Sequence, residues 1–168
     1  PHCYSLPALA PGSHHIKIRI DNSPSSVPAE IQSSHAWTDG TQTNWNGILG
    51  DFYIEATPHT YLEQVQVYPS VKEKKARIHV NIYSDSEQSG VVTLSAKTWN
   101  TQQEHLLLDM EKQVGLSKGE NKIELTLDMG NRMQTWSEFH PTLYALNVTL
   151  ATNEGKDNII TDFGMRDF

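Results

Sequence analysis

Apolar and polar residues alternate strictly in the stretch RIHVNI at residues 77–82, and this stretch decides the fold class. Ile78, Val80 and Ile82 occupy every second position and are separated by polar residues. Successive side chains of a β-strand point to opposite faces of a sheet, so such a stretch buries one face and exposes the other. The stretch therefore predicts a strand with one face in a hydrophobic core.

The same alternation recurs along most of the chain. Further runs lie at residues 16–20, 52–55, 64–67, 92–97, 123–127 and 144–150. Turn-forming residues separate them, as in KGEN at residues 118–121 and NEGKD at residues 153–157. Many short strands at this spacing favour an all-β sandwich over alternating strands and helices. The best helix candidate is residues 102–114, although the three leucines at 106–108 also suit a buried strand.

A domain boundary is predicted at Thr57-Pro58. Gly, Asn, Ser and Thr are frequent before it, whereas alternating runs follow one another regularly after it. Proline lacks a backbone N–H and restricts the residue before it, so Pro58 suits the end of a strand and the start of a linker. We therefore expect two β units, residues 1–57 and residues 58–168.

Composition limits the classes of function. The chain has 168 residues, a hydrophobic fraction of 37% and a formal net charge of −7, which is typical of one large or two small globular domains. An acidic chain is poorly suited to neutralise phosphates, so we expect no nucleic-acid partner. No apolar run approaches the length that spans a membrane, so we expect no membrane partner.

The residues that usually bind metals show no suitable pattern. Cys3 is the single cysteine of the sequence, which excludes an internal disulfide and a Cys-x-x-Cys metal site. The eight histidines lack metal-ligand spacing, and no Gly-rich phosphate loop is visible. We expect neither a metal nor another cofactor.

Three segments follow one another in an order that is informative. They are PGSHHIKIRIDN at residues 11–22, TQTNWNGILGDFYIEATP at residues 41–58, and WSEFHPTLY at residues 136–144 followed by DFGMR at residues 162–166. The first two resemble strands of the N-terminal sugar-binding jelly roll of family 2 glycoside hydrolases. The third resembles elements near the end of the immunoglobulin-like domain of that family. The chain as a whole is most similar to the β-galactosidase-like members.

This resemblance implies an all-β fold. Residues 1–57 would be the C-terminal strands of a jelly-roll (galactose-binding-like) domain, and residues 58–168 an immunoglobulin-like β-sandwich. In this family a (β/α)8 barrel follows and carries two catalytic glutamates, and retaining hydrolysis needs its two carboxyls about 5–5.5 Å apart. No segment of this chain resembles those barrel motifs, so no catalytic residue is carried over. The resemblance therefore implies an inactive region that supports the barrel of a parent enzyme acting on terminal β-glycosidic bonds.

Residues 38–45, in the loop before the Gly-Ile strand of the second segment, form the candidate substrate-binding site. In the family this loop reaches the innermost sugar subsite, and amide, carboxylate and Trp side chains suit sugar hydroxyls and pyranose faces. The candidates, with Asn44 as first choice, are Asp39, Gln42, Asn44, Trp45 and Asn46. In the alternative, structural interpretation, Trp45 fills a core pocket while the two asparagines hold a tight turn.

Arg166 is the candidate inter-domain residue, because the corresponding Arg of the family lies where the sandwich meets the barrel.

The resemblance also suggests a periplasmic or secreted parent enzyme, although the residues of this chain do not fix the compartment. A second hypothesis from another class stays open: a self-standing β-sandwich that binds carbohydrate or protein without a catalytic barrel.

Overall fold

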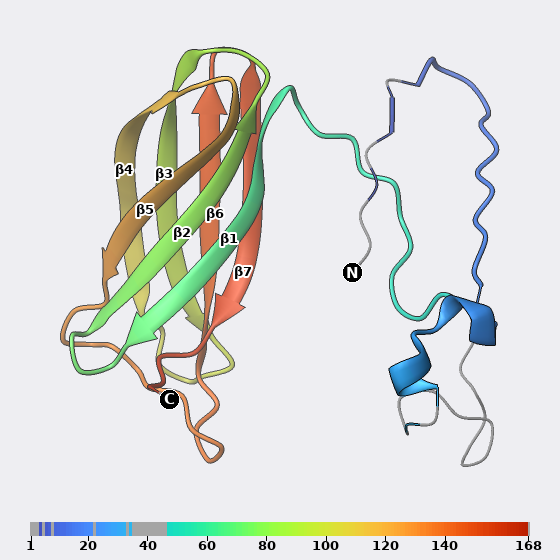
Figure 1. Ribbon diagram of the computed structural model, residues 1–168. Helices are drawn as coiled ribbons and strands as arrows, with labels where there is room; N and C mark the ends of the chain where they lie inside the picture. Colours follow the sequence, from blue (N-terminus) through green and yellow to red (C-terminus); the bar gives the residue numbers. More distant parts are fainter. Residues whose placement is uncertain are drawn as a thin grey trace. The chain divides into compact units, whose positions relative to one another are not determined.

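The computed structural model describes residues 4, 6–7, 9–21, 23–32, 34 and 47–167. The chain divides into two compact units, Pro1–Ile54 and Glu55–Phe168. All seven strands of the described residues lie in the second unit, which is an antiparallel β-sandwich (Figure 1). The helical segments of the described residues span three residues each and are too short to cross a membrane.

The sandwich consists of two sheets that pack face to face. One sheet has the strand order β1-β2-β5 and the other the order β4-β3-β6-β7. Figure 1 shows the first sheet in front of the second. The strands are β1 (Thr60–Ser70), β2 (Lys75–Ser84), β3 (Gln88–Trp99), β4 (Leu106–Leu116), β5 (Gly119–Asp128), β6 (Leu143–Thr152) and β7 (Gly155–Phe163). Every strand pair is antiparallel.

The hydrophobic core lies between the two sheets and is built from alternate residues of each strand. In β2 the three apolar residues of the stretch that decided the fold class, Ile78, Val80 and Ile82, are fully buried. In β6 the inward residues Tyr144, Leu146 and Val148 are equally inaccessible to solvent, and polar neighbours face outward. The strands predicted at residues 64–67, 77–82, 92–97, 123–127 and 144–150 are confirmed as parts of β1, β2, β3, β5 and β6.

The ambiguous region at residues 102–114 contains a strand from Leu106 onward and no helix. Strand β4 begins at Leu106 and pairs with β3, so the helical interpretation is wrong. The alternation of β4 was hidden in the sequence because the pairing of β3 with β4 is irregular between Leu94 and Ala96. Such irregularities shift the inward and outward positions along a strand.

Two predicted strands are absent from the described part of the first unit. Residues 16–20 and 52–55 contain no strand, and the side chains of Ile16, Ile18, Ile20 and Phe52 are at least half exposed. Alternation gives a segment two different faces, but a strand also needs a neighbour that accepts its backbone hydrogen bonds. The described residues of this unit instead form two short 3-10 helices, Pro24–Ser26 and Ala29–Ile31. That residues 1–57 belong to a jelly roll stays a prediction.

A buried polar pair lies at one end of the core. His105 is only 4% exposed, and its Nδ1 lies 2.8 Å from the hydroxyl of the fully buried Tyr144. The Tyr144 hydroxyl also accepts a hydrogen bond of 2.9 Å from the backbone N–H of Gln134, so this one hydroxyl contacts both groups. Burial lowers the pKa of His105, and the positive charge of Arg132 lowers it further. Burial also raises the pKa of Tyr144.

The lowered pKa of His105 predicts that acid destabilises the sandwich. The unfolded chain binds a proton at His105 below a pH of about 6.5, whereas the folded chain resists protonation until the pH is lower. The contribution of His105 to stability is therefore complete above about pH 6.5 and is lost as the pH falls through the folded pKa. Urea unfolding between pH 5 and 8 measures this slope. His105→Gln is expected to flatten it, whereas His140→Gln, at an exposed position, serves as the matched control.

Candidate functional site

The candidate sugar-binding residues are not placed by the structure. Asp39, Gln42, Asn44, Trp45 and Asn46 lie outside the described residues. The description resumes at Gly47, and the residues from there to Glu55 are exposed. Their role in substrate binding stays a prediction.

The two parts of the third sequence segment meet at one corner of the sandwich. Trp136 forms an isolated antiparallel bridge with Pro141, and its backbone N–H donates a hydrogen bond of 3.0 Å to the carbonyl of Met165. The exposed Arg166 places its guanidinium carbon 4.7 Å from the centroid of the Trp136 ring. Such a cation–π contact fixes a long, flexible side chain over a rigid aromatic surface. The corner therefore holds the Arg166 guanidinium in a defined orientation.

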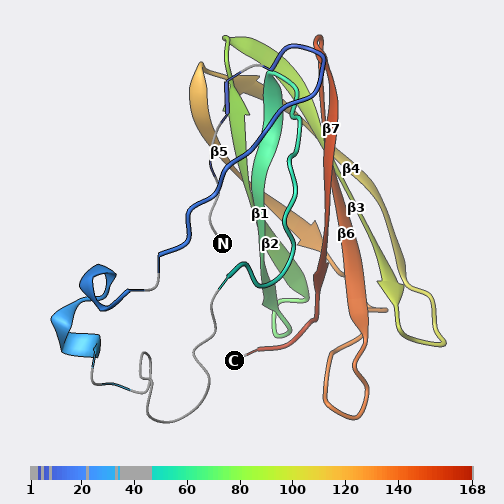
Figure 2. The ribbon, with the colours of Figure 1, turned by 90° about the vertical axis from the view of Figure 1, so that its right-hand side faces the viewer.

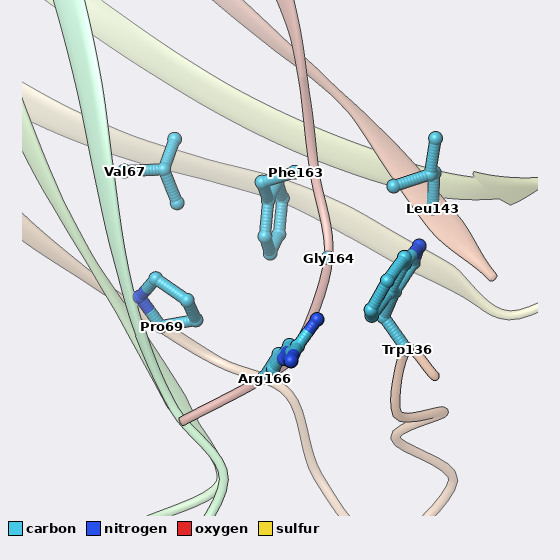
Figure 3. Close-up of a pocket in the computed structure, with 7 residues that line it drawn as sticks. All are labelled: Val67, Pro69, Trp136, Leu143, Phe163, Gly164 and Arg166. Atoms are coloured by element: carbon cyan, nitrogen blue, oxygen red, sulfur yellow. The ribbon is translucent and has the colours of Figure 1, made fainter. Parts of the chain in front are cut away.

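A shallow groove of about 320 Å³ lies beside this corner (Figure 3). It runs between strands of different sheets, because β1 supplies Val67 and Pro69 and the end of β7 supplies Phe163. The lining is apolar apart from Arg166, as the full set shows: Val67, Pro69, Trp136, Leu143, Phe163, Gly164 and Arg166. In Figure 3 the Arg166 side chain lies between Pro69 and Trp136 at the rim of the groove. An apolar floor with one cation is suited to contact a protein segment.

Two aspartates near the C-terminal end of the chain fasten β1 beside β7. Asp157 accepts a hydrogen bond of 2.8 Å from the backbone N–H of Leu62, near the start of β1. Asp167 accepts one of the same length from the backbone N–H of Val71, just after β1 ends. Figure 2 shows β1 and β7 at this edge of the sandwich. These contacts give the groove a defined width, because they hold its two walls at fixed places.

The described carboxylates lie outside the groove and outside the buried core. No aspartate or glutamate lines the groove, and the buried polar residues of the described chain are three threonines, one serine and His105. Asp21 is the described carboxyl with a lowered pKa, and hydrogen bonds from Ser23 are the main cause. Within the described ranges, no group of His, Cys, Asp or Glu side chains could hold a metal ion.

Gly164 is required by the packing of Trp136. A Cβ atom placed at residue 164 would lie 2.8 Å from the Cβ and 3.0 Å from the Cγ of Trp136. These atoms are close to the backbone, so the corner has to move as a whole to make room. We expect Gly164→Ala to lower the free energy of unfolding by about 1–2 kcal/mol, a cost typical of overpacking.

The matched control is Gly115→Ala in β4, where an added Cβ meets no atom within 4 Å. Thermal unfolding followed by circular dichroism compares the two variants, and Trp fluorescence reports on the Trp136 ring. Equal stability of both variants would contradict a tight contact between Gly164 and Trp136.

The floor of the groove could not be predicted from sequence patterns. The third segment pointed to Trp136, Leu143 and Arg166, and the structure brings these residues together. Val67 and Pro69 were missed, because their side of the groove depends on how the two sheets pack. The one available signal was Pro69 itself, since proline within a strand indicates an edge.

Comparison with known proteins identifies the class. The family model "Glycosyl hydrolases family 2" matches residues 60–166, which is the whole sandwich from the start of β1 to the Trp136–Arg166 corner. The fold is thus that of an all-β domain of a carbohydrate-active enzyme family. The chain belongs to family 2 of the glycosyl hydrolases.

Several solved structures match part of this chain at low sequence identity. Parabacteroides merdae β-glucuronidase is 17% identical with a TM-score of 0.48, and the match covers 64% of this chain and 13% of that chain. Bacteroides uniformis β-glucuronidase is 16% identical with a TM-score of 0.49, covering 64% and 14%. A GH2 β-galacturonidase from Eisenbergiella tayi, bound to galacturonate, is 17% identical with a TM-score of 0.45, covering 65% and 19%. This chain therefore spans less than a fifth of the length of these enzymes. The search of curated proteins found no match.

Proposed function

We propose that this chain is the non-catalytic β-sandwich region of a retaining glycoside hydrolase that cleaves terminal β-glycosidic bonds. The catalytic barrel would belong to the same polypeptide, and the sandwich would hold it in place. The observation that carries this proposal is the family match over residues 60–166, which contains the whole sandwich and its Trp136–Arg166 corner. The sugar specificity suggested by the sequence segments is β-galactosidase-like.

The chemistry of the described residues supports this division of labour. A retaining enzyme needs two carboxyls that face each other at a sugar site, one as nucleophile and one as acid and base. The groove offers apolar contacts and one cation but no carboxylate. A surface of this kind is suited to bind another protein segment, but it lacks the acid and the nucleophile that cleavage of a glycoside requires.

The groove is the part of the sandwich that we expect to face the barrel. The Arg166 guanidinium is exposed and oriented by Trp136, and its planar set of N–H donors suits a two-pronged contact with a carboxylate. Leu143 and Phe163 provide apolar surface next to it. In this proposal, Arg166 pairs with an acidic residue of the barrel while the groove covers an apolar one.

The loop at residues 38–45 would contribute the rim of the sugar site. Asn44 is the first candidate for a direct sugar contact, with Asp39, Gln42, Trp45 and Asn46 beside it. The sandwich has to hold such a rim firmly, since a misplacement of substrate-positioning groups by about 1 Å can lower the rate of the catalysed reaction on the order of 100-fold.

The proposal is tested by comparing this chain with a longer polypeptide that continues along its reading frame. The pure 168-residue chain is expected to release no nitrophenol from nitrophenyl β-galactoside, β-glucuronide or β-galacturonide. The longer polypeptide is expected to hydrolyse at least one of them with retention of the anomeric configuration. Turnover by the 168-residue chain alone would refute the division of labour, and an inactive longer polypeptide without barrel sequence would refute the enzyme assignment.

Arg166→Gln in the longer polypeptide tests the contact with the barrel. We expect kcat/KM to fall roughly 10- to 100-fold, because the barrel loses its fixed position relative to the sugar-site rim. Lys118→Gln, which removes an exposed cation from the turn between β4 and β5, is the matched control and should leave kcat/KM unchanged. Unfolding of the isolated chain shows whether Arg166→Gln alters the sandwich itself.

A further inference from the structure

The outer face of the β1-β2-β5 sheet carries an unusual set of side chains. Along β1 and β2 it presents tyrosines, amides and one histidine, in a strip that runs lengthwise over the sheet and ends beside the exposed Arg77, which is opposite Tyr68. We call it the tyrosine–amide strip, and its members are Tyr61, Gln64, Gln66, Tyr68, His79, Asn81 and Tyr83. In Figure 1 this sheet faces the viewer, and no other strand of the sandwich lies in front of it.

The strand register explains why these residues share one face. The pairing of β1 with β2 places Tyr61 opposite Tyr83 and Gln66 opposite His79. Their neighbours along β2, such as Val80 and Ile82, point into the core. An irregularity between Leu62 and Gln64 shifts the alternation of β1 by one residue, which keeps Gln64, Gln66 and Tyr68 on the outer side.

Two pairs of rings lie at the two ends of the strip. Tyr61 and Tyr83 have ring centroids 5.5 Å apart, and Tyr68 and His79 have centroids 4.7 Å apart. Tyr68 is 44% and Tyr83 36% exposed, so both rings are accessible to a ligand. Tyr83 and His79 are four residues apart on one strand, which separates the two pairs by roughly 13 Å. A single sugar cannot contact both pairs, but a short chain of sugars can.

Side-chain amides occupy the space between the ring pairs. Asn81 donates a hydrogen bond of 3.3 Å from Nδ2 to Oε1 of Gln64, and the Tyr68 hydroxyl donates one of 3.2 Å to Oε1 of Gln66. Each amide has two N–H donors and an oxygen with two acceptor sites. These contacts use only part of that capacity, so donors and acceptors remain for the hydroxyls of a ligand.

The charge of the strip favours a neutral ligand. Tyrosine and amide side chains are uncharged at neutral pH, and His79 lies 3.3 Å from the carboxylate of Glu124. Arg77 lies at one end of the strip, and the next strand, β5, alternates Glu120, Lys122 and Glu124 on the same face, so neither sign dominates. The whole chain has a net charge of −7, which disfavours polyanions.

We propose that the tyrosine–amide strip binds an uncharged oligosaccharide chain laid along β1 and β2. The tyrosine rings stack on the apolar faces of pyranose rings, and the amides bond to their hydroxyls. The strip lies on a different surface from the Trp136–Arg166 groove and does not need a catalytic barrel. It would hold a polysaccharide next to an enzyme of this family without cleaving it, and it does not depend on the proposed function.

Affinity electrophoresis of the 168-residue chain tests the proposal. Gels contain a neutral polysaccharide (galactan, xylan or mixed-linkage β-glucan) or the acidic polygalacturonate. We expect at least one neutral polysaccharide to slow migration, and a soluble oligosaccharide of the same type to bind saturably by calorimetry. Unchanged migration in all neutral gels, or retardation by polygalacturonate alone, would overturn the proposal.

Variants assign the binding to the strip. Tyr83→Ala and Tyr68→Ala are each expected to weaken binding roughly tenfold, the loss of one stacking contact. Tyr53→Ala removes an exposed tyrosine outside the sandwich strands and should leave binding unchanged. Binding that survives both strip variants would place the ligand elsewhere and overturn the assignment.

An isosteric variant covers the case in which a tyrosine variant fails to fold. Gln64→Glu keeps the shape of the side chain but introduces a charge in the middle of the strip, and it is expected to weaken binding at least tenfold. Gln113→Glu, an equally exposed change on β4 of the other sheet, is its matched control. Equal affinities of these two variants would contradict a ligand that lies across Gln64.

Discussion

Replacing Ile78 by alanine is expected to lower the free energy of unfolding of the sandwich by about 2–5 kcal/mol. Ile78 is fully buried in the central strand of its sheet, between Val67 of β1 and Leu125 of β5. Truncation removes buried carbons from the core and leaves a cavity that neighbouring strands fill only in part. For a domain of about 100 residues, each kcal/mol shifts the melting temperature by about 4 °C or more.

The matched control is Ile160→Ala in β7, where the same side chain is 65% exposed. We expect this change to stay within about 0.5 kcal/mol of the unchanged protein, as is usual for surface positions. Chemical and thermal unfolding followed by circular dichroism measure both variants. A small and equal effect of the two substitutions would show that the core does not lie between the sheets.

Replacing Tyr144 by phenylalanine is expected to cost about 2 kcal/mol or more. The substitution keeps the ring, which stacks on Phe163 with centroids 5.4 Å apart, and removes only the hydroxyl. His105 Nδ1 then loses its hydrogen-bond partner and the backbone N–H of Gln134 loses its acceptor. Each buried polar group that is left without a partner costs about 1–3 kcal/mol.

Tyr53→Phe removes the hydroxyl of a tyrosine that is exposed to solvent and serves as the control. Urea unfolding at pH 8, where His105 is neutral in both states, isolates the effect of the hydrogen bonds from that of protonation. If Tyr144→Phe is as stable as Tyr53→Phe, the hydroxyl does not connect the loop before β4 with the loop before β6.

The strands of the β1-β2-β5 sheet and the central strands β3 and β6 could be predicted from the sequence, whereas the edge strands β4 and β7 could not. Strand β2 is paired on both sides and packs against the other sheet, so its alternation is strict and easily recognised. Strand β7 went unpredicted. Its inward side includes Asp157 and Thr161 besides Ile159 and Phe163, because Asp157 fastens β1 instead of filling the core. A polar residue that makes a structural hydrogen bond on the inward side of an edge strand interrupts the apolar–polar alternation from which strands are predicted.

The first unit shows the limit of alternation as a predictor. Residues 16–20 alternate as cleanly as the confirmed strands, yet their isoleucines are half exposed and no strand forms there. A strand is stabilised by its neighbours, and a single segment carries no information about whether they are present. The corner of Trp136 and Arg166 was indicated by its sequence segments, but the groove also needed β1 of the opposite sheet.

The attachment of β1 to the C-terminal end of the chain affects how the sandwich bears mechanical load. Leu62 is bonded to Asp157 and Val71 to Asp167, so β1 and β7 run in the same direction along one seam. Tension applied between the start of β1 and the end of β7 acts along this seam as shear. Both carboxylate contacts then resist together, because sliding one strand past the other strains them at the same time. The sandwich can thereby transmit a pull between its two ends while its apolar interior stays undisturbed.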